Sequence, residues 1–142
     1  MDVKREESGL KDRPLALRKA ILHAVAIAPV LAIGALSVVP GEDRPHVFGS
    51  WPSQLEHMAA YIISATVLAL VYAPELKPVR IVLFLSAYGA ALEFCQIWIP
   101  GRNAALIDVA ADVVGALIGI AAAMTIVRAM PEIHAKLRIL EG

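Results

Sequence analysis

The sequence predicts an all-α fold, an integral membrane four-helix bundle that occupies the 142-residue chain as a single domain. Hydrophobic residues make up 58% of the chain. Charged residues make up 18%, against about 25% in ordinary soluble domains. Several long runs of the chain carry almost no charged residues. Their lengths are close to the roughly 20 mainly apolar residues that a transmembrane helix needs. A soluble globular domain and a disordered chain are therefore both disfavoured.

Four stretches of the chain have the composition of membrane spans. They are nearly devoid of Asp, Glu, Lys and Arg and cover residues 20–40, 57–73, 79–99 and 113–127. With ends placed at Pro, Gly and polar residues, the expected spans are about 19–40, 55–73, 79–99 and 108–129. Residues 1–18 form a highly charged segment that we expect to be unstructured. Residues 131–142 form a tail, either a short amphipathic helix on the membrane surface or a solvated segment.

The first span is expected to be a retained helix and not a cleaved signal peptide. Its leader carries four acidic as well as six basic residues, and no convincing small-x-small cleavage motif precedes Gly41. The second span opens with Ser53 and Glu56, whose spacing predicts a capping box at the helix start.

The basic residues predict the orientation of the bundle, because cytoplasmic loops are enriched in Lys and Arg. Eleven of the thirteen lie in the N-terminal segment, the loop after the second span, and the C-terminal tail. The first and third loops hold one each, Arg44 and Arg102. We therefore expect a multi-pass protein of the cell membrane with both termini cytoplasmic. Trp51 and Trp98 fall near the outer interface, where indole rings commonly sit.

Six polar residues stand as three pairs at the edges of the apolar spans. They are His57 and Tyr61, Glu93 and Gln96, and Asp108 and Asp112. Spacings of three and four put both members of a pair on one helix face. Because the spans alternate in direction, all three pairs are expected near the outer edge of the bundle. Arg102, in the loop before the last span, is expected to join them in one shallow pocket.

The cost of burying charge favours a common pocket. A carboxylate well inside a span costs at least ~2.5 kcal/mol, so such groups usually face the bundle interior and are paired. Glu93 and Asp112 are charges of this kind. Gly115 and Gly119, on the same face as Asp112, form a small-xxx-small pattern. The usual role of that pattern is close helix packing, which is the interpretation adopted for these two glycines.

These motifs together resemble the VanZ-like family of small bacterial membrane proteins, named after a protein linked to resistance to the antibiotic teicoplanin. The resemblance rests on His57-x-x-x-Tyr61, Glu93-x-x-Gln96, Pro100-Gly101-Arg102 and Asp108-x-x-x-Asp112-x-x-Gly115-x-x-x-Gly119. It spans residues 53–120 and implies a role at the cell envelope, without an established reaction.

Two positions depart from the family pattern. The family often has an acidic residue about four positions before the histidine, where this chain has Ser53. It usually has Asn where this chain has Asp112. The first departure weakens the case for a histidine–acid pair, and the second adds negative charge to the pocket.

One class of function for the pocket is binding. It then binds or organises an anionic envelope lipid, a glycopeptide antibiotic or a protein partner, and presents Tyr61, Gln96, Arg102 and Asp112 to the ligand. Within this class, Arg102 pairs with Glu93 or Asp108 and helps to fix the loops. We favour binding over chemistry because buried ionisable groups must be paired whether or not they react.

The alternative is a membrane enzyme that acts on a lipid-linked phosphate or a cell-wall precursor. The candidate catalytic residues are then His57, Glu93 and Asp108. Histidine suits this role because its ordinary pKa lies near neutral pH. No serine or cysteine nucleophile accompanies a base in the sequence.

Expected partners are the lipid bilayer and an anionic envelope lipid or lipoglycopeptide. Nucleic acid is excluded because the net charge is zero. No cofactor is expected. A divalent metal ion held by His57, Glu93, Asp108 and Asp112 is an alternative, since histidine with carboxylates suits several divalent ions. The spacing matches no established ligand motif, and the single cysteine, Cys95, cannot form a disulfide within the chain.

Overall fold

The computed structural model describes residues 3–43, 49, 52–72 and 76–132, and this part of the chain is helical with no strand. Its elements are α1 (Val3–Ser37), the short 3-10 helix η1 (Gly41–Asp43), α2 (Ser53–Tyr72), α3 (Pro78–Gln96) and α4 (Leu106–Ala129). The all-helical expectation is confirmed for these residues. Trp51 and nearly all of the tail, from residue 133 onward, lie outside them.

Within the described ranges, four helices are long and apolar enough to cross a membrane. They are Leu15–Ser37, Ser53–Tyr72, Pro78–Gln96 and Leu106–Ala129. Large apolar side chains are exposed on their outer faces, among them Leu31, Leu83, Phe94 and Leu106. Exposed apolar faces suit contact with lipid, and the helices satisfy their own backbone hydrogen bonds. The architecture is therefore compatible with a multi-pass membrane protein.

The expectation of an unstructured N-terminal segment is wrong, because α1 is already helical at Val3. Leu, Ala, Glu, Lys and Arg dominate this segment and are all strong helix formers. A helix extends more easily than it nucleates, so the apolar span that follows can propagate its helix back through charged residues. A smaller difference occurs in α3, which ends at Gln96 instead of Ile99.

The tightest packing in the bundle is between α2 and α4, and two glycines of α4 make it possible. A Cβ atom on Gly115 would lie 2.5 Å from the carbonyl oxygen of Met58, and one on Gly119 would lie 2.5 Å from that of Ile62. Neither distance leaves room for a side chain. The packing interpretation of the small-xxx-small pattern is therefore confirmed.

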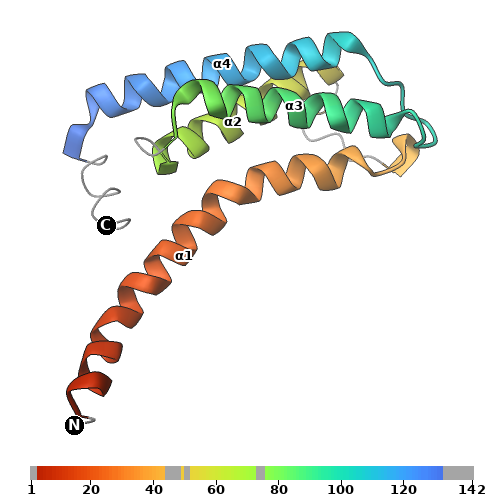
Figure 1. Cartoon of the computed structure of the whole chain (residues 1–142). Helices are drawn as coiled ribbons and strands as arrows, with labels where there is room; N and C mark the ends of the chain where they lie inside the picture. The colour runs from red at the N-terminus through yellow and green to blue at the C-terminus, as the bar shows by residue number, and fades with distance from the viewer. Residues whose placement is uncertain (1–2, 44–48, 50–51, 73–75, 133–142) are drawn as a thin grey trace.

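The helix α1 joins the bundle mainly through its C-terminal part. Figure 1 shows this part running beside the other helices, whereas the N-terminal part diverges from them. The hydroxyl of Tyr88 on α3 donates to the carbonyl of Val30 at 3.1 Å. Beyond the helix, the N–H of Gly41 donates to the carbonyl of Pro100 at 3.1 Å. Gly101 has a φ of 71°, a backbone conformation that favours glycine, so the glycine at this position allows the turn to form.

Candidate functional site

The predicted polar residues lie at one end of the bundle. The start of α2, the end of α3 and the start of α4 meet there, beside the end of α1 (Figure 1). We define the polar cluster as His57, Tyr61, Glu93, Gln96, Asp108 and Asp112. All of its members are buried except His57, which is partly buried. The alternation of helix direction is the reason that residues from three separate segments share this end.

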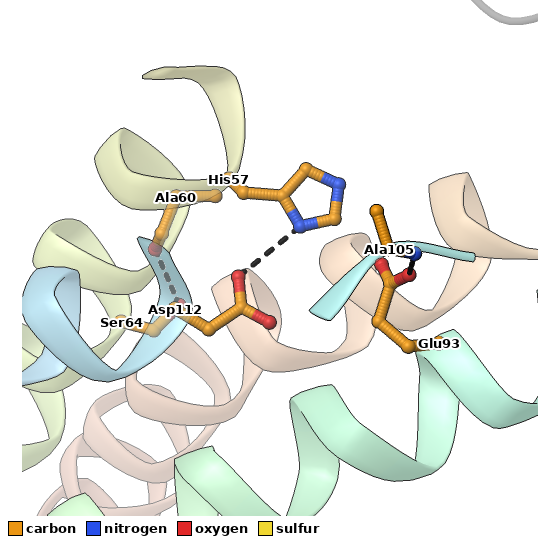
Figure 2. A network of polar contacts seen from close by, with 6 residues as sticks. All are labelled: His57, Ala60, Ser64, Glu93, Ala105 and Asp112. Atoms are coloured by element: carbon orange, nitrogen blue, oxygen red, sulfur yellow. Dashed lines mark hydrogen bonds and ion pairs between the residues drawn. The ribbon is translucent and has the colours of Figure 1, made fainter. Parts of the chain in front are cut away.

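His57 and Asp112 form the central contact of the polar cluster. The Nδ1 atom of His57 lies 3.1 Å from Oδ1 of Asp112, and the two side chains are 12% and 1% exposed (Figure 2). A carboxylate only accepts hydrogen bonds, so this contact places the hydrogen of a neutral imidazole on Nδ1. The lone pair is then on Nε2. Asp112 thus fixes both the orientation and the tautomer of the ring.

Glu93 connects the end of α3 to the start of α4. Its Oε2 atom accepts a hydrogen bond from the backbone N–H of Ala105 at 2.9 Å, as Figure 2 shows. Ala105 immediately precedes the helix, and its N–H has no intrahelical acceptor. The carboxylate therefore stabilises the entry into α4, although the other oxygen, Oε1, has no partner among the described residues.

Asp108 completes a compact group with His57 and Glu93. One ligand-type atom of each residue lies within 4.8 Å of those of the other two. Asp108 is 6% exposed, and its Oδ1 atom has no hydrogen-bond partner in the described part of the chain. Three helices therefore each supply one nitrogen or oxygen atom that could bind a metal ion, and the three atoms lie close together.

Tyr61 extends the polar cluster toward the interior of the bundle. A Cβ atom on Gly89 would lie 2.3 Å from Oδ2 of Asp112 and 2.8 Å from the hydroxyl oxygen of Tyr61. Both side chains therefore rest against the backbone of α3, at a place where only glycine leaves room. Gln96 Nε2 is buried and makes no hydrogen bond to described residues. The hydroxyl of Tyr61 is close enough to the carboxyl group of Asp112 for the two groups to interact.

Arg102 lies at the end of α1. Its Nε atom donates to the carbonyl of Val39 at 3.0 Å, and a terminal guanidinium nitrogen donates to the carbonyl of Leu36. A cation at this position satisfies orphan carbonyls and complements the negative end of the helix dipole. The expected pairing with Glu93 or Asp108 is not among these contacts, and a ligand-binding role for Arg102 stays a prediction.

Two further groups, a buried carboxyl group on α2 and a backbone N–H at the start of α4, were not predicted from the sequence. Glu56 was assigned to a capping box with Ser53, yet its N–H donates to the carbonyl of Pro52 at 3.3 Å and its side chain is 6% exposed. Its position next to His57 at the start of a span was the available signal. The backbone N–H of Ala105 could not be recognised from the type of the residue, because its side chain takes no part in the contact. Only the fold brings this N–H to Glu93.

The chemistry available here combines an oriented imidazole, carboxylate oxygens that lack partners, and two buried groups able to donate hydrogen bonds. Such a set can bind a ligand that offers both donors and acceptors, accept a proton at Nε2 of His57, or coordinate a cation. Comparisons with protein-family models, with curated proteins and with solved structures find no match to this chain.

Proposed function

We propose that this chain is a multi-pass protein of the bacterial cell membrane, similar to the VanZ-like family, and that its polar cluster binds the headgroup of an envelope lipid. The four apolar helices support the membrane location. The eleven basic residues in the N-terminal segment, the loop after the second span and the C-terminal tail, against one each in the first and third loops, support an arrangement with both termini in the cytoplasm. The polar cluster then lies at the extracytoplasmic edge.

One observation carries the proposal: three buried polar atoms of the cluster have no partner among the described residues. They are Glu93 Oε1, Gln96 Nε2 and Asp108 Oδ1. Buried polar side chains in native proteins nearly always have hydrogen-bond partners. A purely structural network would satisfy its own members. Unmet donors and acceptors at one place indicate that the partner is a ligand.

The position of the polar cluster favours a lipid headgroup as that ligand. It lies at the end of apolar helices, where the polar part of a membrane lipid is found. Headgroup hydroxyls can donate to the oxygens of Glu93 and Asp108, and phosphate oxygens can accept from Gln96. The N-termini of α2 and α4 also lie at this end of the bundle, and the positive ends of their helix dipoles favour a negatively charged group.

A second candidate is a membrane enzyme that acts on a lipid-linked phosphate or a cell-wall precursor, and the His57–Asp112 contact favours it. An imidazole whose Nδ1 is held by a carboxylate presents Nε2 as a general base. Glu93 and Asp108 would then polarise or position the substrate. Chemistry predicts an altered product in the cell, whereas binding alone predicts altered retention or distribution of the lipid.

The test is deletion of the gene followed by profiling of lipids and cell-wall precursors, with complementation by wild type, Glu93→Gln or the exposed control Glu42→Gln. We expect wild type and Glu42→Gln to restore the profile. Glu93→Gln should accumulate to the wild-type level in membranes and fail to restore it. An unchanged profile after deletion contradicts the proposal, and degradation of Glu93→Gln alone indicates a structural network.

A further inference from the structure

We propose that the polar cluster holds one divalent cation of the first transition series, with His57, Glu93 and Asp108 as its protein ligands. The inference rests on the proposed function, because it concerns the same cluster and names what the lipid headgroup would meet there. The ligands come from three helices, and one donor atom of each lies within 4.8 Å of the other two. Ligand atoms around a tetrahedral zinc ion are separated by about 3.4 Å, so binding would draw the three side chains together by about an ångström.

The unsatisfied oxygens of two buried carboxylates are a second observation that favours a cation, which would then take the place of headgroup hydroxyls as their partner. Glu93 and Asp108 are each 6% exposed, and Glu93 Oε1 and Asp108 Oδ1 have no hydrogen-bond partner in the described residues. Buried carboxylates are normally paired with a cation or coordinate a metal. Asp112, 1% exposed, adds a third carboxyl group within the polar cluster. Even if His57 were protonated, it would set one positive charge against these three carboxyl groups.

Asp112 occupies the position that a supporting residue has in many metal sites. A histidine that binds a metal usually donates its other ring N–H to a carboxylate, which fixes the tautomer and raises the basicity of the ligand nitrogen. His57 makes this contact through Nδ1 at 3.1 Å. In Figure 2 the second ring nitrogen is on the side of the ring facing Ala105 and Glu93. His57 Nε2 is therefore the ligand atom, and Asp112 is a positioning residue.

The donor set indicates the class of metal and what the metal does for the ligand. One imidazole with two carboxylates suits Zn²⁺, Mn²⁺ or Fe²⁺ better than a purely oxygen-binding ion. Three protein ligands leave coordination positions open. A phosphate oxygen of a lipid can occupy such a position. The cation thus resolves a difficulty of the proposed function, since it lets a cluster of carboxylates accept an anionic headgroup.

The test is metal binding by the full chain purified in detergent. After treatment with chelator, the protein is dialysed against Zn²⁺ or Co²⁺, and the retained metal is measured by mass spectrometry. We expect one equivalent per chain, visible absorption bands from bound Co²⁺, and a higher Tm with Zn²⁺ than with chelator. The Tm comparison uses wild type only, so it does not depend on the folding of any variant.

Isosteric variants assign the ligands. Glu93→Gln and Asp108→Asn should each lower the Co²⁺ affinity at least tenfold and remove the Zn²⁺-dependent rise in Tm. Asp112→Asn should lower the affinity by about 10- to 100-fold without changing the number of ligands. The control Glu42→Gln should bind as wild type does. Wild type that retains no cation, or variants that bind with wild-type affinity, would overturn the inference.

The outcome is separable from that of the proposed function. If the chain binds no cation but Glu93→Gln still fails to restore the lipid profile, the metal site is wrong and the lipid proposal is retained. If the chain binds one cation but deletion of the gene leaves the lipid profile unchanged, the lipid proposal is wrong and the metal site is retained.

Discussion

At the scale of single residues, the fold depends on polar side chains that connect segments far apart in the sequence. Arg102 donates to the carbonyls of Leu36 and Val39, so the loop before α4 holds the end of α1. Glu93 accepts from the N–H of Ala105, so α3 holds the start of α4. Both contacts use side chains to satisfy backbone groups that helix ends leave unpaired.

Replacement of Arg102 by Ala should therefore destabilise the protein through α1. Two charge-assisted hydrogen bonds are lost, each worth about 1.5–3 kcal/mol where the group is shielded from water. Because Arg102 is only partly buried, we expect a net loss of about 1–3 kcal/mol and a lower Tm in detergent. Arg80→Ala, at an exposed position on α3, is the matched control. Equal Tm values for the two variants would show that the α1 contacts contribute no stability.

The proximity of His57, Glu93 and Asp108 was predictable from the sequence. It requires only the spacing on each helix and the alternation of span direction, both of which the charge-free runs define. The position of Arg102 was not predictable, because its acceptors are backbone carbonyls that any residue provides. In the N-terminal segment two signals disagree: the charge content is typical of a solvated, unstructured segment, whereas the helix propensity of its residues favours the helix that the structure shows.

At the scale of elements, the α2–α4 pair is the framework that carries the polar cluster. Gly115 and Gly119 lie against the backbone of α2, and the same two helices carry His57 and Asp112 one or two turns away. Close approach of the helices is what brings the imidazole and the carboxylate to 3.1 Å. The packing seam and the site are therefore coupled: a wider separation of the helices would lengthen that contact.

The sign of the stability change caused by Gly115→Ala tests this coupling. On an unconstrained helix the change should stabilise by about 1 kcal/mol, because alanine is the better helix former. Here the added methyl would meet the carbonyl of Met58, so we expect a net loss of about 1–3 kcal/mol, measured as a lower Tm.

Ala121→Val, on the exposed face of α4, is the control for added volume and should leave Tm nearly unchanged. An increase in Tm for Gly115→Ala would contradict the close packing of α2 and α4.

At the scale of the whole molecule, the chain is asymmetric in charge although its net charge is zero. The apolar helices separate an end rich in basic residues from an end that carries the polar cluster. The same asymmetry predicts orientation, since basic residues are retained on the cytoplasmic side. Under this rule the basic end would face the cytoplasm and the polar cluster would face the opposite side.

Fusions of alkaline phosphatase report this orientation, because the enzyme is active only outside the cytoplasm. We expect activity for a fusion after Gly49 and none for a fusion after Lys77. A fusion after Lys77 that is active, with one after Gly49 that is not, would place the polar cluster on the cytoplasmic side.

The central claim is that the polar cluster binds a lipid, and native mass spectrometry of the full chain extracted from its own membranes tests it most directly. Wild type and Glu42→Gln should each carry one bound lipid that survives mild delipidation, and Glu93→Gln should carry none while keeping the Tm of a folded protein. A wild-type chain that retains no lipid, or a Glu93→Gln chain that retains the same lipid equally well, would contradict the account.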